Sequence, residues 1–282
     1  MTSPDIPSKP SGAFRILHIS DLHTGLADWH WSYLLDKRFF GRLNQFTTRQ
    51  RKLSLENIAR LAKEYTRCQA DMLVCTGDLT SIGSQEEFQH AQELLAPLLL
   101  AAGKNFLYVP GNHDAYVSKN RHALEEAFRK LNGNRLRLDE LPQSLCAGPV
   151  EFICLSPARP CAIWLSTGEI SAAVWEKLDY IFSCPAQARI RMLVTHFPLH
   201  GPSGRPLSWR TKFVGYPRLS QWGANGRFQA ILSGHVHRPF LLPPQKDGYW
   251  QIGAGSLTIQ DSFSLIDIHG TTGEITPHIL HF

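Results

Sequence analysis

The sequence contains no hydrophobic run long enough to cross a membrane. Its longest apolar stretch, at residues 94–102, is interrupted by Pro97 and is far shorter than the roughly 20 residues that a transmembrane helix needs. Residues 1–14 are polar and rich in serine and proline, and they have neither the apolar segment nor the cleavage site of a secretory signal. The sequence therefore predicts a cytoplasmic protein.

Cysteine is sparse, and none of the 6 cysteines forms a CxxC pair, which excludes a small disulfide-stabilised protein and favours free thiols in a reducing compartment. Charge is limited as well, because 29 basic and 24 acidic residues leave a net charge of only +5. This mild excess favours an anionic partner without specifying nucleic acid, lipid or phosphate ester. The hydrophobic content of 43% is ordinary for a globular protein and excludes disorder.

The apolar residues form short runs that alternate with helical patterns. Runs rich in valine, leucine and isoleucine occur at 14–20, 71–77, 104–111, 190–195 and 228–234. Apolar spacing of three and four residues predicts helices at 52–67, 85–101, 119–131 and 171–182. This alternation is typical of an α/β protein built from βαβ units.

The five apolar runs all end in side chains that can bind a metal ion. In open α/β sheets the carboxyl ends of the strands form the ligand crevice, where side chains lie on a rigid scaffold. Each of these residues alone is more simply explained as a turn former, a helix cap or an ordinary histidine. Five such junctions together predict one convergent site, formed by Asp21, His23, Asp78, Asn112, His113, Asp114, His196, His235 and His237.

These side chains offer oxygen and imidazole nitrogen as donor atoms. This donor set suits manganese, iron or zinc better than calcium, which prefers oxygen alone, or a structural zinc site, which favours thiolates. A carboxylate can bridge two cations, and two ions about 3.5–4 Å apart can hold the nucleophile and the phosphoryl oxygens of a displacement reaction. The junctions are therefore compatible with a dinuclear metal site.

The motifs at these junctions resemble those of the calcineurin-like metallophosphoesterase superfamily. They read DLH at 21–23, GDL at 77–79, GNHD at 111–114, a single histidine at 196 and GHVH at 234–237, in the order and spacing of that family. The resemblance implies a four-layer αββα sandwich of two mixed β-sheets flanked by helices, in a single domain at 1–282 with a cap-like insertion. It also implies a metal-dependent hydrolase that acts on phosphoric ester or diphosphate bonds.

The resemblance assigns metal ligands motif by motif, and no ligand position departs from the family pattern. The two divalent ions would be manganese, or else iron, zinc or a mixed pair, because such ligand sets accept several metals. The expected ligands are Asp21, His23 and His237 for the first ion, Asp78 as the bridge, and Asn112, His196 and His235 for the second ion.

The same resemblance implies that His113 and Asp114 are catalytic. His113 would donate to a phosphoryl oxygen or protonate the leaving alkoxide, and Asp114 would orient and charge its imidazole ring. Asn112 would help to position the phosphoryl group of the substrate, and the metal ions would withdraw charge from the phosphoryl oxygens.

Two segments are longer than the roughly 2–6 residues of an ordinary βα loop, and both follow ligand-bearing strands. A basic and aromatic insertion spans 24–52, and a second active-site loop insertion, which includes Trp209 and Arg210, spans 200–218. Mixed aromatic and basic residues are typical of segments that contact anionic lipid or phosphate. An equally good explanation is that the aromatic side chains only pack the insertions onto the domain.

Within the superfamily, the stretch KRFFGRLN at 37–44 resembles a bacterial branch that includes the chlamydial-type UDP-2,3-diacylglucosamine pyrophosphohydrolases. Gln50 interrupts the arginine pair that follows in that branch. The resemblance implies cleavage of this nucleotide-linked lipid to lipid X and UMP in lipid A biosynthesis. It also implies substrate contacts from Arg38 and Arg42, and peripheral contact with the anionic inner membrane.

Two alternatives stay open at this stage. One is a soluble phosphodiesterase for 3′,5′-cyclic nucleotides or for a broad range of diesters. The other is a non-catalytic binding module with the same fold, which the intact ligand set disfavours. Nucleic acid is a less favoured partner because the basic residues are local and the whole chain is only mildly basic. The sequence predicts no particular oligomeric state.

Overall fold

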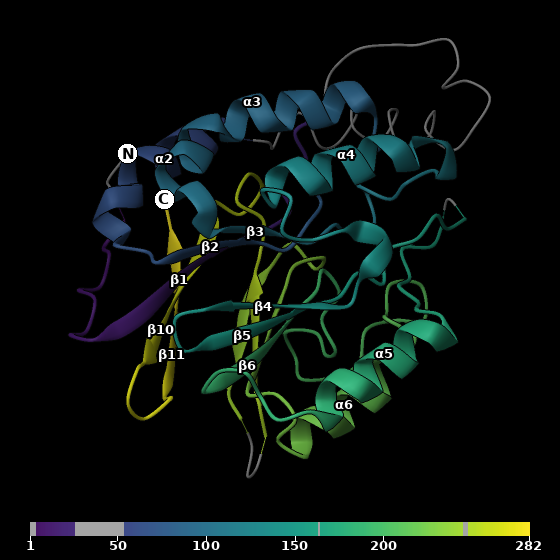
Figure 1. Ribbon diagram of the computed structural model, residues 1–282. Coiled ribbons are helices and arrows are strands. Elements are labelled where there is room, and N and C mark those ends of the chain that lie inside the picture. Colours follow the sequence, from purple (N-terminus) through teal and green to yellow (C-terminus); the bar gives the residue numbers. More distant parts are fainter. Residues whose placement is uncertain (1–3, 26–53, 163, 245–247) are drawn as a thin grey trace.

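The computed structural model describes residues 4–25, 54–162, 164–244 and 248–282. Two β-sheets pack face to face between two groups of helices. In Figure 1, helices α2, α3 and α4 lie together over one sheet, and α5 and α6 lie over the other. The predicted four-layer αββα sandwich is therefore confirmed.

The first sheet is mixed. Strand β1 pairs in parallel with β2, which pairs in parallel with β3, while β10 pairs antiparallel with β1 and β11. The strand order is β11 (Ile275–His281), β10 (Ser262–His269), β1 (Ala13–Ile19), β2 (Met72–Cys75) and β3 (Phe106–Tyr108).

The second sheet is also mixed, with the parallel strands β5, β6, β7 and β9 between two antiparallel edge strands. Its order is β4 (Gln143–Ala147), β5 (Val150–Cys154), β6 (Ile190–Val194), β7 (Ala230–Ser233), β9 (Trp250–Ala254) and β8 (Pro239–Leu242).

Side-chain alternation explains why the parallel strands are almost continuously apolar. On β6, Met192 and Val194 belong to a hydrophobic cluster that also contains residues of the first sheet, such as Leu265. Leu193, between them, belongs to a second cluster together with Leu178 of α5. A strand that is covered on both faces has no solvent-facing side to carry polar residues.

The helices agree with the predicted ones within a few residues, except for the short helix α6, which was not predicted and only begins within the second insertion at 200–218. This helix has a proline in its first turn, and the only large side chains that it buries are those of Leu219 and Trp222, so its periodic signal is weak. The helices are α2 (Glu56–Cys68), α3 (Gln85–Ala102), α4 (Arg121–Leu131), α5 (Ala172–Ser183) and α6 (Tyr216–Ala224), with 3₁₀ turns at Gly103–Asn105, Ser118–Asn120 and Leu138–Glu140.

Most of the insertion at 24–52, with Arg38 and Arg42, lies outside the described residues. Within the described ranges, no helix is both long and apolar enough to span a bilayer. The six cysteines are unpaired, and Cys146 is exposed on the edge strand β4.

Candidate metal centre

The predicted metal ligands lie in turns that directly follow the strands. Five of them adopt left-handed backbone conformations, with φ between 48° and 72°, which residues other than glycine seldom adopt. Such strain persists only where the surrounding structure enforces it, and it concentrates at functional sites. The five residues are Asp21, His23, Asp78, His235 and His237.

Backbone hydrogen bonds hold the turns after β1 and β2 together. The amide of Asp21 donates to the carbonyl oxygen of Gly77 at 2.9 Å, and the amide of His23 donates to that of Asp78 at 2.9 Å. The predicted ligands that follow these neighbouring parallel strands thus lie close together.

Two glycines let the ligand turns approach one another. A Cβ atom on Gly111 would collide with the carboxylate of Asp78, and a Cβ atom on Gly234 would collide with Ser20 and with Asp21 Oδ2. Both positions therefore require the absence of a side chain.

Ligand atoms of Asp21, His23, Asp78 and His237 all lie within 4.8 Å of one another. Nε2 of His237 lies 3.0 Å from Nε2 of His23 and 3.3 Å from Oδ1 of Asp21. This cluster contains every residue that was predicted to hold the first ion, together with the predicted bridge.

A second group of ligand atoms gathers around the side-chain oxygen of Asn112. Its Oδ1 atom lies 3.2 Å from Nε2 of His196 and 2.9 Å from Nδ1 of His235. Oδ2 of Asp78 lies 3.3 Å from Nε2 of His196 and 3.9 Å from Nε2 of His23, so this one carboxylate oxygen faces both groups. The roles of Asn112, His196 and His235 as ligands of the second ion stay a prediction, which this geometry supports.

Backbone carbonyls orient two of the imidazole rings. Nδ1 of His196 donates to the carbonyl oxygen of Thr76 at 2.6 Å, and Nε2 of His235 donates to that of Thr211 at 2.8 Å. Because a carbonyl oxygen can only accept, the other nitrogen of each ring is the one that can bind a cation. In both rings that nitrogen faces Asn112.

The charges at the site suit a cation. Burial acts to raise the pKa of Asp78, but His196 and His113 hold it well below its usual range, so the carboxylate is ionised. Burial acts to lower the pKa of His196, but Asp78 raises it to about 9, so a metal ion would displace a proton there. Burial lowers the pKa of His235 to about 3, which keeps this ring neutral.

One buried oxygen gives a direct test of whether a metal ion fits. Oδ2 of Asp21 accepts a hydrogen bond from the backbone amide of His235 at 3.0 Å. Oδ1 of Asp21 is buried and, among the described residues, forms no hydrogen bond of good geometry, although Nε2 of His237 lies 3.3 Å and Nε2 of His23 lies 3.9 Å from it. A buried carboxylate oxygen without a well-formed hydrogen bond is costly unless a cation binds it. Together with the surrounding imidazoles, this oxygen fits a divalent ion.

The ring of His113 lies at the edge of the first cluster, with its centroid 4.9 Å from that of His23. Its Nδ1 atom donates to the carbonyl oxygen of Ser81 at 2.7 Å, and its backbone amide donates to Oδ1 of Asp78 at 2.8 Å. His113 is therefore placed beside the ligands, where its predicted catalytic role requires it.

The role of Asp114 as the partner of His113 stays a prediction, which the hydrogen bonds of this carboxylate do not support. The carboxylate of Asp114 accepts hydrogen bonds from the amide and hydroxyl groups of Thr80, the hydroxyl group of Tyr108 and the amide of Gly111. All four donors lie within 3.0 Å of a carboxylate oxygen of Asp114. Among the described residues, the His113 ring does not donate to this carboxylate. Asp114 ties the turns after β2 and β3 together instead.

Sequence reasoning missed the carbonyl groups of Thr76, Ser81 and Thr211, because a backbone acceptor leaves no side-chain signature. It also missed Tyr116, whose ring stacks on His113 at a centroid distance of 5.7 Å and an interplanar angle of 10°. An aromatic residue two positions after the GNHD motif was the available signal.

A cavity of about 260 Å³ opens over the site and is lined by Asp78, Asn112, His113, Ser166, Thr211, His235, Val236 and His237. Thr211 belongs to the second insertion, so part of 200–218 does border the predicted mouth. Polar groups and ligand atoms therefore converge on one open cavity.

Known structures share this architecture. A dimetal phosphatase from Danio rerio is 12% identical, with a TM-score of 0.66, and the alignment covers 95% of this chain and 96% of that one. Purple acid phosphatase PPD1 from yellow lupin seeds is 10% identical, with a TM-score of 0.57, and covers 96% of this chain and 54% of that one. At such identities the likeness concerns the fold alone. No curated protein matches the sequence.

The family model of the calcineurin-like phosphoesterases matches residues 14–239, which include every predicted ligand. Since this match covers most of the chain, the protein belongs to the calcineurin-like phosphoesterase family and is a metal-dependent phosphoester hydrolase.

Proposed function

We propose that the protein uses two divalent ions, with manganese favoured, to hydrolyse a phosphodiester or pyrophosphate bond, and that its substrate is UDP-2,3-diacylglucosamine. The observation that carries the dinuclear part is the position of Asp78. One of its carboxylate oxygens faces His23 of the first ligand group and His196 of the second, at 3.9 and 3.3 Å. A carboxylate between two ligand groups is suited to bridging two ions.

When bound, the two ions would lower the pKa of water and withdraw charge from the phosphoryl oxygens. The chain itself supplies orientation and a proton donor. Because Nδ1 of His113 donates to Ser81, proton transfer to a leaving oxygen is assigned to Nε2. Asn112, in the same cavity, orients the phosphoryl group through its amide.

The lipid part of the proposal is supported by a surface that we call the tryptophan rim, formed by Trp164, Trp209, Arg210, Lys212 and Val214. The side chains of Trp164 and Trp209 are 66% and 64% exposed, and Val214 is 47% exposed. Exposed tryptophans beside cationic side chains suit the boundary between lipid headgroups and acyl chains.

The tryptophan rim adjoins the metal centre. The amide of Ser166 donates to the carbonyl oxygen of Arg210 at 2.8 Å, so the two segments that carry the tryptophans run side by side. Ser166 and Thr211 from these segments also line the cavity over the ligands. Contact between the rim and an anionic inner-membrane surface would therefore bring the cavity to its lipid substrate. Arg38 and Arg42 stay predicted substrate contacts.

A substrate panel with added manganese tests the reaction. UDP-2,3-diacylglucosamine in mixed micelles or anionic vesicles is compared with cyclic AMP, a chromogenic phosphodiester and a monoester. We expect release of UMP from the lipid, and its loss in Asp78→Asn and His113→Ala variants that keep the fold by circular dichroism. Turnover of cyclic AMP but not of the lipid would reject the proposed substrate, and unchanged low activity in both variants would reject the enzyme site.

The tryptophan rim is tested separately. Trp209→Ala is expected to lower turnover on anionic vesicles while leaving hydrolysis of a soluble chromogenic diester unaltered. Tyr180→Ala is the matched control, because Tyr180 is 72% exposed on α5 and is not part of the rim. Equal effects of the two substitutions on vesicle turnover would contradict a membrane role for the rim.

A further inference from the structure

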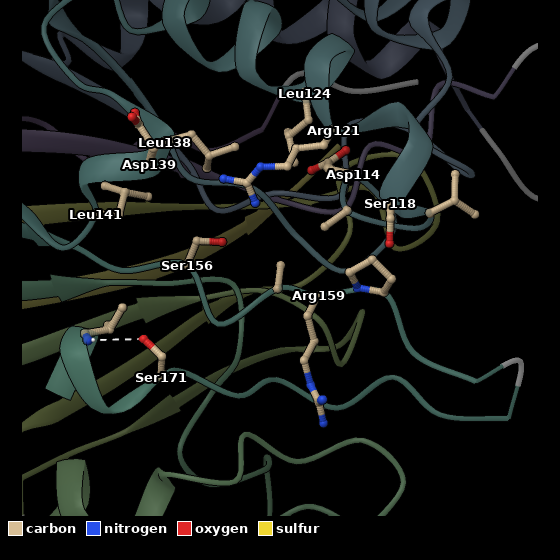
Figure 2. Close-up of a pocket in the computed structure, with 15 residues that line it drawn as sticks. Asp114, Ser118, Arg121, Leu124, Leu138, Asp139, Leu141, Ser156, Arg159 and Ser171 are labelled. Atoms are coloured by element: carbon tan, nitrogen blue, oxygen red, sulfur yellow. Dashed lines mark hydrogen bonds between the residues drawn. The ribbon is translucent and has the colours of Figure 1, made fainter.

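A second cavity, of about 420 Å³, lies beside the metal centre between the two halves of the sandwich. Figure 2 shows its residues on opposite walls. Leu124 and Arg121 of α4 and Leu138 come from the side of the first sheet, whereas Ser156 and the N-terminal end of α5 come from the side of the second sheet. This volume lies within the range of about 300–1,000 Å³ that is usual for small-molecule sites.

The position of this cavity relates it to the metal centre. Asn112 and His113 line the metal cavity, and Asp114, Ala115 and Val117, which follow directly in the chain, line the second cavity. The segment after β3 therefore borders both spaces.

The opposite wall of the second cavity also lies next to the metal centre. Strand β5 neighbours the ligand-bearing strand β6 in the second sheet and runs parallel to it. Ser156 lies just beyond the carboxyl end of β5, as His196 lies just beyond that of β6. The second cavity is thus one strand away from the metal centre at the same edge of the sheets, where open α/β sheets bind their ligands.

The charged groups that line the second cavity all have partners within the protein. Nε of Arg121 lies 2.7 Å from Glu125, a terminal nitrogen of Arg159 lies 2.8 Å from Glu169, and Oδ1 of Asp139 lies 3.5 Å from Nε of Arg137. In Figure 2 the Arg159 side chain extends away from the other labelled residues. The carboxylate of Asp114 accepts the four hydrogen bonds described above.

The polar groups at the start of α5 are satisfied in the same way. The hydroxyl oxygen of Ser171 accepts a hydrogen bond from the amide of Val174, which Figure 2 shows as a dashed line. The remaining lining is largely apolar and includes Val117, Leu124, Leu138, Leu141, Pro160 and Val174. Such walls favour an uncharged, apolar group over a second phosphate or a carboxylate.

We infer that the second cavity binds the apolar part of the substrate, an alkyl or acyl chain attached to the phosphate ester whose phosphoryl group lies at the metal centre. This inference rests on the proposed phosphoesterase reaction and adds a specificity site to it. The ester is held at two points, with its phosphoryl group at the ligands around Asp78 and its chain between α4 and α5.

A homologous series of p-nitrophenyl alkyl phosphodiesters, from methyl to octyl, tests the inference with the manganese-loaded protein. Each methylene that enters an apolar cavity raises kcat/KM by about fourfold. We expect such a rise over the first several methylenes, followed by a plateau when the cavity is full. An octyl ester that is hydrolysed no better than the methyl ester would overturn the inference.

A binding measurement separates this failure from a failure of the proposed reaction. If no ester releases p-nitrophenol, the proposed reaction fails, and calorimetric titration with methylphosphonate and octylphosphonate then tests the cavity directly. Tighter binding of octylphosphonate by tenfold or more supports the apolar site, and equal affinities reject it.

Two matched substitutions on α5 locate the effect. Val174→Trp places an indole ring at the cavity wall and is expected to flatten the chain-length dependence. Ala173→Trp, at the neighbouring exposed position, is expected to keep it. If Val174→Trp does not fold, Ala158→Phe takes its place. A full chain-length dependence in the filled variant, or its loss in both tryptophan variants, would contradict binding in this cavity.

Discussion

The substitution Asp114→Asn distinguishes a structural from a catalytic role for this carboxylate. The two oxygens of Asp114 accept four hydrogen bonds, from Thr80, Tyr108 and Gly111. An asparagine keeps one oxygen, which can continue to accept from Thr80, but its amide group then faces the Gly111 amide and the Tyr108 hydroxyl group. The hydroxyl group can rotate and accept, whereas the Gly111 amide is left without an acceptor.

The substitution leaves one buried donor unsatisfied, which lowers the free energy of unfolding by about 1–3 kcal/mol. Loss of the charge offsets part of the cost, because burial and the neighbouring Asp78 raise the pKa of Asp114 to about 6. Unfolding entropies near 2.1 cal/mol/K per residue give about 0.6 kcal/mol per degree for a chain of this length. Without the offset Tm would fall by about 2–5 °C, so with it we expect a smaller fall of about 1–3 °C.

Thermal unfolding of the metal-free protein, together with kinetics on diesters of good and poor leaving groups, tests this reasoning. A structural role predicts the lower Tm and equal fractional losses of kcat on all diesters. An unchanged Tm with a selective loss on poor leaving groups would refute it, because that pattern belongs to a residue that acts through His113. Asp139→Asn is the control, since the Asp139 side chain is 56% exposed and its substitution should leave Tm unaltered.

Three further changes have defined outcomes. Gly234→Ala, whose Cβ atom would meet Ser20 and Asp21, is expected to cost about 1–3 kcal/mol in urea unfolding and to weaken manganese binding in calorimetric titration. Asp267→Ala leaves the buried Arg15 guanidinium without its carboxylate and should cost about 3–5 kcal/mol, whereas replacing both residues by apolar ones should recover most of the loss. Manganese at 100 times its Kd should stabilise the protein by about 3 kcal/mol against unfolding, and a chelator should reverse this shift in Tm.

Much of the fold could be predicted because its signals are local. Helix α3 begins at a capping box formed by Ser84 and Glu87, and its predicted range differs from the observed one by one residue. Helix α6 was missed because it is short, has a proline in its first turn and buries few side chains. In a segment rich in loops, such a weak local signal does not distinguish a loop from a short helix that is stabilised only by tertiary packing.

At the metal centre, too, some features could be predicted from the sequence and others could not. The GNHD and GHVH motifs place glycines at 111 and 234, and the structure shows the carboxylates of Asp78 and Asp21 in the space that a Cβ atom at these positions would fill. The partner of His113 was assigned to the adjacent Asp114, although the imidazole donates to the carbonyl oxygen of Ser81. Proximity in the chain does not decide which groups meet when a tight turn directs neighbouring side chains to opposite sides.

The sequence by itself determined an α/β architecture and the strand ends whose side chains meet at the metal centre, because strand periodicity and the five terminal motifs are local properties. The four-layer αββα arrangement followed from the resemblance that those motifs carry. Only the tertiary structure decided that an oxygen of Asp78 faces both ligand groups, that Asp114 stabilises the turns, and that a cavity lies between α4 and α5. These features depend on distances between segments far apart in the chain, which packing of the two sheets sets and no local pattern encodes.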